Sequence, residues 1–490
     1  MSRLSTMPAV LREAADLIER SRTDTSIHAE VGEHGVVHVR PDPALLGDRP
    51  QDVDLAWDFG DPDAPRNRVP GFNAAHVYRK PGRYVVTLVV TRATDVRVLR
   101  RVIEVRESSR RVIEGLPDGP VGDDAVVRFE RGRVYSLDRS IEIAGRNVVL
   151  EAVGSGPLPV LRWTGGRGDI VRCLPGCRDV RIEGLAFDAV GKRGDRYQIA
   201  TAIAAAGRNV AVIGCRFDQV QDAVNANSQP AGLLLQNCTA GDNLHAYFCW
   251  VEGTDIVLLD NHATHSIAEH IVRVGGAERL ACVGNDFTNR RKSCFNVQVA
   301  EQAWLEGNTV RGAWALGPLG GGDGRNPADR CTAAVVRRNH ADDTLLIKHG
   351  AQAVRVEANV ITADDRAAVQ VEGFSSDFQR GVADITLCNN IATNAGQRGN
   401  FLRIDGPAES IRLIGNHYLA PRLRPGSHGT ASIMILDHDA RALTQLRNNH
   451  WPDTRLRNLP FAGIGTHYVW PYWSDKRGYI TDEQLAERRR

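Results

Sequence analysis

The pattern of apolar and polar positions divides the chain near residue 110. Between about Val36 and Val105 apolar and polar residues alternate between turn signals, as in VHVRPD, DLAWDFGDPDAP and GRYVVTLVVT. Alternation with a period of two is typical of strands that bury one face. It predicts a small antiparallel β-sandwich at residues 35–107. The preceding stretch, MSRLSTMPAVLREAADLIERSR, predicts an amphipathic helix within an N-terminal segment, residues 1–34.

After about Arg110 short apolar strands recur, with spacings mostly in the low to middle twenties, from VAVIGCRF to LTQLRNNHW. One such repeat cannot bury its apolar face alone, so stacked repeats must share a core, and asparagines at one turn can hydrogen-bond from rung to rung. The pattern predicts a parallel β-helix over residues 108–455 and a capping tail, residues 456–490. The predicted ladder positions are Cys215, Asn237, Asn261, Asn285, Asn308, Asn339, Asn359, Asn390, Asn416 and Asn449.

Composition excludes several classes of function. The 61 Lys and Arg residues balance 59 Asp and Glu residues, so no basic field favours nucleic acid as a partner. No apolar run reaches the roughly 20 residues needed to cross a bilayer, which argues against membrane insertion. Nine cysteines without a CxxC pair indicate buried, reduced thiols rather than disulfides or a zinc site. We expect a monomer or a small homo-oligomer.

Two resemblances sharpen the fold prediction. The segments WDFGD (57–61) and HVYRKPGRYVVTLVV (76–90) resemble the PKD family, in which Trp57 and Tyr84 would be core residues. That resemblance implies an accessory spacer or adhesion unit and favours an extracellular or cell-surface location, although no signal peptide is visible. The repeats resemble the pectate-lyase-like superfamily of right-handed parallel β-helices, whose members include lyases, hydrolases, epimerases and adhesins.

A second strand precedes each ladder position by about ten to thirteen residues, as in AVNAN, FCWVE, NVQVA, LIKHG and LRIDG. Side chains flanked by inward-facing apolar residues point outward, and rungs stack about 4.8 Å apart. The sequence therefore predicts one outward column suited to an elongated anionic ligand. Its members are Asn225, Trp250, Arg273, Gln298, Lys348, Gln370, Arg403 and Leu436. Glu252, Glu372 and Asp405 stand two residues further along their strands.

An acidic polysaccharide is the predicted substrate, and β-elimination is the reaction that these residue types favour. Arg273 and Arg403 would hold the uronate carboxylate, and Lys348, beside cationic neighbours, would remove the adjacent proton. Asn225, Trp250, Gln298, Gln370 and Glu252 would contact the polymer. A Gly-rich insertion, WALGPLGGGDGRNPADR (314–330), would displace one rung and bring Arg325 to the substrate as part of a wall or lid.

Several alternatives stay open. Glu372 and Asp405, on neighbouring rungs, could bind Ca²⁺, since carboxylates are hard oxygen ligands, or could form a pair for glycoside hydrolysis. Epimerisation would share the proton abstraction of a lyase. A non-catalytic carbohydrate-binding or adhesive β-helix is the remaining class. Arg273 and Arg403 could also form only surface ion pairs with Glu252 and Asp405.

Overall fold

The computed structural model describes residues 25–189, 199–241, 244–317, 330–373, 381–405, 408–422, 432–435 and 443–451, with two short strands, β44 (Trp473–Ser474) and β45 (Gly478–Tyr479). The predicted N-terminal helix (residues 1–22) and all of the predicted capping tail except these two strands lie outside the described residues. No helix in the described part of the chain is long and apolar enough to cross a bilayer.

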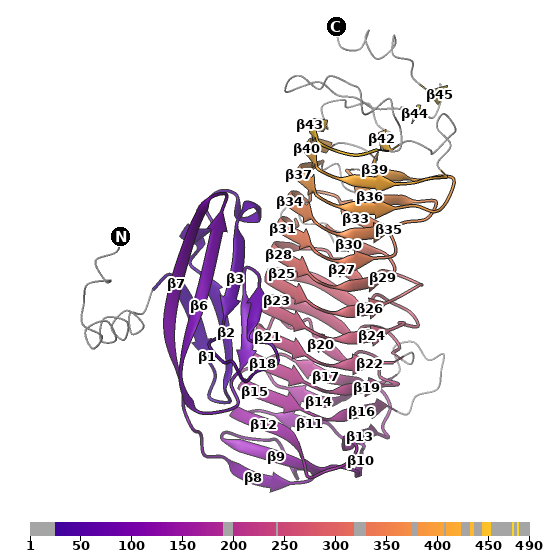
Figure 1. The fold of residues 1–490 in the computed structure, drawn as a ribbon. Helices are drawn as coiled ribbons and strands as arrows, with labels where there is room; N and C mark the ends of the chain where they lie inside the picture. Colours follow the sequence, from indigo (N-terminus) through magenta and orange to yellow (C-terminus); the bar gives the residue numbers. More distant parts are fainter. Residues whose placement is uncertain are drawn as a thin grey trace, which may run out of the picture.

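The N-terminal unit is a sandwich of a three-stranded and a four-stranded antiparallel sheet (Figure 1). Its first strand begins before residue 35, where the sequence pattern places the start of the sandwich. Trp57 is buried in the core, as predicted, and its indole N–H donates to the carbonyl of Gly71 at 2.9 Å. Tyr84 is half-buried, and its ring contacts that of the buried Tyr78, with centroids 4.0 Å apart and the planes tilted by 33°. The strands are β1 (Ile27–Val31), β2 (Val36–Pro41), β3 (Asp54–Asp58), β4 (Arg68–Pro70), β5 (Ala74–Val77), β6 (Gly82–Arg92) and β7 (Asp95–Val105).

Strands β8 to β43 stack in parallel, which confirms the predicted right-handed parallel β-helix (Figure 1). Each rung contributes one strand to each of three faces. In the order in which the chain meets them, we call these faces face 3, face 1 and face 2. Strand β8 (Arg111–Glu114) pairs with β9 (Ala125–Glu130) at the N-terminal end. Strands β23 (Cys249–Leu259) and β25 (Val272–Val283) run through the corner between faces 1 and 2, so these two faces form one continuous sheet.

Face 1 consists of β11 (Ile141–Ile143), β14 (Asp169–Cys173), β17 (Thr201–Ala205), β20 (Val224–Ala226), the first parts of β23 and β25, β27 (Phe295–Val297), β30 (Trp314–Leu316), β33 (Leu345–Lys348), β36 (Ala367–Glu372), β39 (Asn400–Asp405) and β42 (Ile433–Ile435). Face 2 consists of β9 (Ala125–Glu130), β12 (Arg146–Val153), β15 (Arg178–Glu183), β18 (Arg208–Ile213), β21 (Ala231–Gln236), the second parts of β23 and β25, β28 (Ala300–Glu306), β31 (Thr332–Arg337), β34 (Gln352–Glu357), β37 (Val382–Cys388), β40 (Ala408–Ile414) and β43 (Leu443–Arg447).

Face 3 is a separate sheet of twelve short strands. They are β10 (Val134–Leu137), β13 (Val160–Trp163), β16 (Ala186–Ala189), β19 (Arg216–Asp218), β22 (Thr239–Ala240), β24 (His262–Thr264), β26 (Asp286–Thr288), β29 (Thr309–Arg311), β32 (His340–Ala341), β35 (Val360–Thr362), β38 (Ile391–Thr393) and β41 (His417–Leu419). Side chains from all three faces fill a continuous apolar core. All nine cysteines are free thiols, and all but the half-buried Cys388 are buried, as the sequence predicts.

The predicted asparagine ladder forms at the turn between faces 2 and 3, from Asn261 to Asn449. At each step the backbone and side-chain N–H groups of one asparagine donate to the side-chain oxygen of the next, as from Asn285 to Asn308 at 2.9 Å. Steps range from 20 to 33 residues along the chain. The prediction is wrong at Asn237. The preceding rung enters the ladder through Cys238, whose backbone N–H donates to Asn261, because the register places Cys238 opposite that residue.

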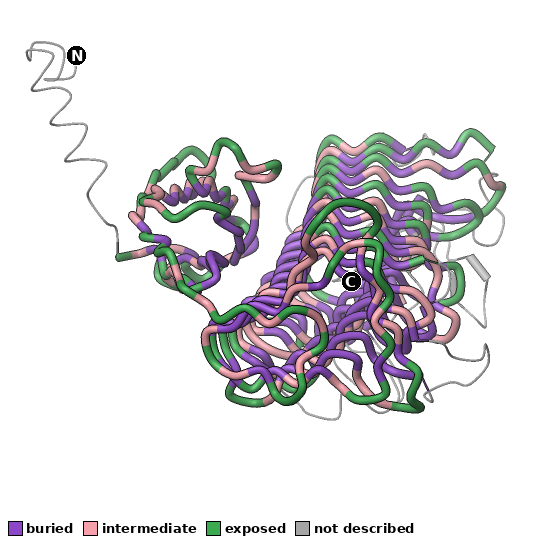
Figure 2. The backbone as a smooth tube through the Cα atoms, turned by 90° about the horizontal axis from the view of Figure 1, so that it is seen from below, coloured by how far each residue is buried: buried purple, intermediate pink, exposed green. Residues whose placement is uncertain are grey.

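The sandwich packs against face 2 of the helix. Outward-facing apolar residues on six successive rungs join the core of the sandwich in a single cluster: Ala211, Leu234, Val257, Ala281, Trp304 and Val335. Figure 2, which looks along the helix from its β8 end, shows this wall of the helix buried where the sandwich lies. Face 2 is therefore covered along these rungs, and among the described residues the shared cluster includes none from face 1 or face 3.

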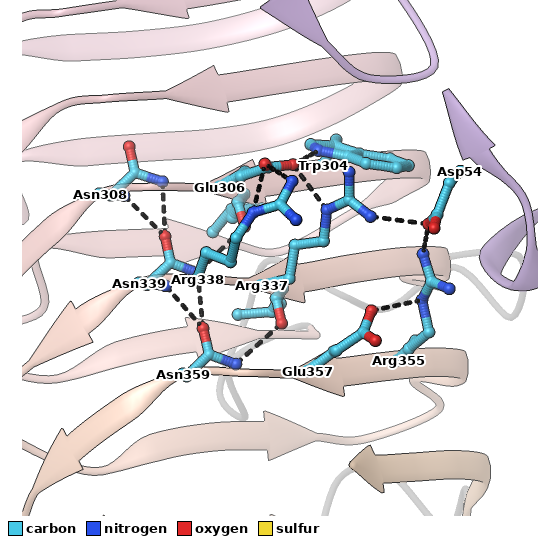
Figure 3. A network of polar contacts seen from close by, with 12 residues as sticks. Asp54, Trp304, Glu306, Asn308, Arg337, Arg338, Asn339, Arg355, Glu357 and Asn359 are labelled. Carbon is cyan, nitrogen blue, oxygen red and sulfur yellow. Dashed lines mark hydrogen bonds and ion pairs between the residues drawn. The ribbon is translucent and has the colours of Figure 1, made fainter. Parts of the chain in front are cut away.

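Ion pairs run along the length of this interface. Asp54 of β3 accepts hydrogen bonds from Arg337, at 2.7 Å, and from Arg355, on neighbouring rungs (Figure 3). Arg337 also donates to Glu306 at 2.7 Å, and its guanidinium lies 4.6 Å from the centre of the Trp304 ring. Further pairs between the two units are Arg79 with Glu183, Arg208 with Glu30, Arg40 with Asp255, Arg66 with Asp260 and Arg49 with Asp384.

Candidate functional site

Face 1 carries the predicted outward column, and the structure corrects its register. Asn225, Trp250 and Arg273 are neighbours, as predicted. Arg273 then pairs with Asn296 rather than Gln298, and the column continues through Ala315, Leu346, Gln370 and Arg403. Residues two apart on a strand face the same way, so a shift of two residues keeps every side chain outward while it changes its neighbours.

The same shift places Gln298 and Lys348, two predicted members of the column, in the neighbouring column. Lys348 pairs with Glu372, and Glu372 pairs with Asp405. Gln298 is only 5 % exposed, which leaves little of it for a ligand. The prediction that the Gly-rich insertion displaces one rung is wrong, because the first three residues of the 314–330 segment form β30, which stacks in place between β27 and β33. Arg325 and Leu436 lie outside the described residues.

Five polar side chains from β33, β36 and β39 form a connected group, which we call the carboxylate cluster. The amide N–H₂ group of Gln370 donates to both Glu372 and Asp405, at 2.9 Å each. The ammonium of Lys348 lies 3.1 Å from Glu372, and the guanidinium of Arg403 donates to Asp405 at 2.9 Å. Each carboxylate thus has one cationic partner. The predicted ion pair of Arg403 with Asp405 is present.

The two carboxyl groups of this cluster are close together. One oxygen of each lies 2.9 Å from the same nitrogen of Gln370, so the two oxygens are separated by at most about twice that length. Burial raises the pKa of Asp405 above its usual value, and the nearby charge of Glu372 adds to this effect. The hydrogen bond and the charge of Arg403 oppose it. Asp405 therefore holds its proton to higher pH than an ordinary aspartic acid does.

A second group on face 1, the aromatic cluster, consists of Tyr247, Trp250 and Arg273. The Tyr247 and Trp250 rings lie 5.3 Å apart, and the guanidinium of Arg273 lies 5.1 Å from the centre of the Trp250 ring. Arg273 also donates to the hydroxyl of Tyr247 at 3.2 Å. Aromatic faces beside a guanidinium can hold a sugar ring and its carboxylate. Tyr247 was not predicted, although its place three residues before Trp250 in YFCW is a usable signal.

Asp222 lies one rung before Tyr247 and was also missed. It is buried, and it accepts hydrogen bonds from the side chain of Asn225 at 3.0 Å and from the backbone N–H of Tyr247 at 3.2 Å. Burial raises the pKa of its carboxyl to about 6. Asn225 is thus held by Asp222. Glu252 lies over Gly275, where an added Cβ would stand 2.4 Å from its carboxylate, so Gly275 leaves room for it.

The two clusters are well separated along the helix. Five rungs lead from Arg273 to Arg403, which at about 4.8 Å per rung is roughly 24 Å. The sequence prediction requires Arg273 and Arg403 to hold the same carboxylate, and this separation makes that impossible. The two arginines can contact different units of one elongated chain.

The predicted calcium ligands do not form a complete site by themselves. Among the residues that the structure describes, no three or more His, Cys, Asp and Glu side chains are grouped to hold a metal ion. Glu372 and Asp405 are two carboxylates, each paired with a cation, whereas Ca²⁺ takes six to eight oxygen ligands. These residues therefore do not fit the ion.

Solved structures of other proteins are similar to this chain at low identity. No curated protein matches the sequence. An endo-xylogalacturonan hydrolase from Aspergillus tubingensis is 11% identical, with a TM-score of 0.37, over 68% of this chain and 93% of its own. The mannuronan C-5 epimerase A-module of Azotobacter vinelandii is 14% identical, with a TM-score of 0.40, over 67% and 91%.

A GH87 alpha-1,3-glucanase catalytic domain solved with nigerose is 12% identical, with a TM-score of 0.44, over 87% of this chain and 86% of its own. These likenesses concern the fold alone. Residues 47–106 match the family model described as PKD domain. The chain therefore carries a PKD domain docked on a right-handed parallel β-helix.

Proposed function

We propose that the chain is a polysaccharide-active enzyme that binds an elongated acidic polysaccharide along face 1 and hydrolyses it at the carboxylate cluster. The observation that carries this proposal is the shared hydrogen-bond donor. Gln370 holds Glu372 and Asp405 together on neighbouring rungs, at a separation compatible with the roughly 5 to 5.5 Å of a retaining glycosidase pair.

The environments of the two carboxyls suit different roles. Asp405, whose pKa is raised by burial, would be the general acid, and Glu372, beside Lys348, would be the nucleophile. The glycosidic oxygen would take the proton of Asp405 as its bond to the anomeric carbon breaks, while Glu372 bonds to that carbon. Water would then lose a proton to Asp405 and displace Glu372, which leaves the configuration retained.

The aromatic cluster supports an acidic substrate. Arg273 can pair with a uronate carboxylate while the half-buried Trp250 presents apolar ring surface to the sugar. Tyr247 is only 3 % exposed, and its hydroxyl accepts a hydrogen bond that positions Arg273. The distance between the aromatic cluster and the carboxylate cluster suits a polymer rather than a disaccharide. The sandwich packs on face 2, and among the described residues its shared cluster includes none from face 1.

β-Elimination, which the sequence favours, is the second candidate. Lys348 lies on the same face, and its ammonium is 3.1 Å from Glu372. Its contact is a carboxylate rather than the cationic neighbours that the sequence predicts. The pairing of Arg403 with Asp405 also occupies a cation that elimination would use on the substrate. These two contacts favour hydrolysis over elimination.

One assay separates the candidates. A panel of uronate polysaccharides is incubated with the protein, and both new reducing ends and the ultraviolet absorbance of an unsaturated uronate end are followed. Hydrolysis gives reducing ends without absorbance, and activity is lost in Glu372→Gln and Asp405→Asn. Elimination gives both signals, and they are lost in Lys348→Ala. The matched control is Asp286→Asn on face 3, whose carboxylate is paired with Arg311. If no polymer gives either signal, both reactions are excluded, and carbohydrate binding without catalysis remains as the function.

A further inference from the structure

A polar cavity of about 310 Å³ lies at the junction of the sandwich and the helix, away from face 1. The sandwich contributes residues of β1, β2 and β7, and face 2 contributes one residue each from β18 and β23. Its volume is at the lower end of the roughly 300 to 1,000 Å³ of small-molecule sites, which suits a single sugar-sized ligand. The lining residues are His28, Ala29, Glu30, His38, Val39, Arg40, Arg101, Arg208 and Asp255.

Positive charge exceeds negative charge in this lining, which holds three arginines and two carboxylates. Arg208 donates to both oxygens of Glu30, at 2.6 and 2.8 Å, and Arg40 donates to Asp255 at 2.9 Å. Arg101 donates instead to a neutral group, the backbone carbonyl of Ile27, and no carboxylate pairs with it in the described part of the chain. One guanidinium charge in the cavity is therefore not neutralised.

His38 provides a second, independent sign of a ligand. Its side chain is 5 % exposed and lines the cavity, yet neither ring nitrogen has a hydrogen-bond partner among the described residues. Leaving a buried polar group unpaired costs about 1 to 3 kcal/mol, so such groups usually meet a partner. Burial lowers the pKa of the imidazole, which at neutral pH presents one donor and one acceptor nitrogen.

We infer that this cavity binds a sugar-sized anion that carries one carboxylate or other oxyanion group. Arg101 pairs with the anionic group, and His38 forms a hydrogen bond to a neighbouring oxygen of the ligand. Because residues of both units line the cavity, a bound ligand also bridges the sandwich and the helix. This site is independent of the function proposed for face 1, from which it is separated by the helix wall.

The test uses isothermal titration of the full chain, at low salt, with glucuronate, inorganic phosphate and neutral glucose. We expect saturable binding of one anion per chain and no binding of glucose. Binding of glucuronate alone identifies an organic carboxylate as the ligand class, and binding of phosphate alone identifies an inorganic or phosphorylated one. Arg101→Gln should weaken binding about tenfold or more, because a charge-assisted pair is lost.

Two further variants keep the inference falsifiable. His38→Phe retains a ring of similar size without nitrogens, so it should weaken anion binding while the unfolding temperature stays the same or rises. Arg97→Gln, on the same strand as Arg101 but exposed and paired with Asp95, should bind as the unchanged protein does. The inference is overturned if the unchanged protein binds neither anion, or if Arg101→Gln and His38→Phe both bind as tightly as Arg97→Gln.

Discussion

Asp54 of the sandwich accepts a 2.7 Å hydrogen bond from Arg337 of the helix, and the same carboxylate also accepts from Arg355 on the next rung. Both guanidinium groups are largely buried, whereas Asp54 is 43 % exposed. Removing the carboxylate leaves two buried cations without their shared partner. Asp54→Ala should therefore lower the free energy of unfolding by about 1 to 3 kcal/mol. Because Asp54 is partly exposed, solvent screening weakens its ion pairs, and we expect a value in the lower part of this range.

Chemical denaturation measures this change. The matched control is Asp95→Ala, which breaks the exposed pair with Arg97 and should cost less than about 0.5 kcal/mol. Equal losses in the two variants would mean that the interface pair is no more important than a surface pair.

Trp304 tests whether the sandwich and the helix unfold as one unit. It projects from β28, is fully buried, and meets the ring of Phe72 of the sandwich edge-on at 5.3 Å. Trp304→Ala should cost about 3 to 5 kcal/mol. The substitution leaves an empty space in the core that the sandwich and the helix share, so both units should lose stability together. Hydrogen exchange followed at amides of both units checks this, and a loss confined to helix amides would contradict a shared core.

The asparagine ladder gives a position-dependent prediction. Asn308→Ala removes the acceptor of two N–H groups of Asn285 and the donor to Asn339 within the buried ladder, so it should cost about 3 kcal/mol. Asn449, half-buried, ends the ladder: its side-chain oxygen accepts from Asn416 and its amide donates to the carbonyl of Leu413, but it donates to no further asparagine in the described part of the chain. Asn449→Ala should therefore cost clearly less. Thermal unfolding of the two variants provides the comparison, and similar losses would argue against a cooperative ladder.

Much of the fold was readable because its signals are local and periodic. The alternation before Val105 and the recurring strands after Arg110 predicted both units, and the ladder is as predicted from Asn261 onward. The side-chain parity on face 1 was also correct. Register was not predictable, because a shift of two residues preserves parity, and β30 is only three residues long beside a Gly-rich insertion.

The docking of the sandwich was missed although a signal existed. Face 2 strands such as GLLLQ, DIVLL and RLACV are apolar at successive positions, whereas a strand with one solvated face alternates. Both sides of these strands are buried, one in the helix core and one beneath the sandwich. The pKa of Asp222 could not be read from sequence either, because it depends on burial that neighbouring rungs create.

Asp222 should make stability depend on pH. Its carboxyl has a pKa of about 6 in the folded protein, against 3.8 as the ordinary value. The folded state therefore binds the proton more tightly, and the resulting stability is fully present below about pH 3.8 and is lost as pH rises through about 6. The contribution is on the order of 2 to 3 kcal/mol. Asp222→Asn should abolish this part of the pH dependence in denaturation curves recorded from pH 4 to 7. An unchanged slope would show that another group is responsible.

Arg403 offers a test of the assignment of Asp405 as the acid. If protonated Asp405 donates to the leaving oxygen, hydrolysis is lost as pH rises through its pKa. The hydrogen bond and the charge of Arg403 lower that pKa, so their removal should raise it. Arg403→Gln should then move the alkaline limb of the kcat/KM profile to higher pH. Arg311→Gln, which removes the partner of Asp286 on face 3, is the matched control and should leave the limb in place. A limb that stays fixed or moves to lower pH in Arg403→Gln would rule out Asp405 as the group that loses its proton there.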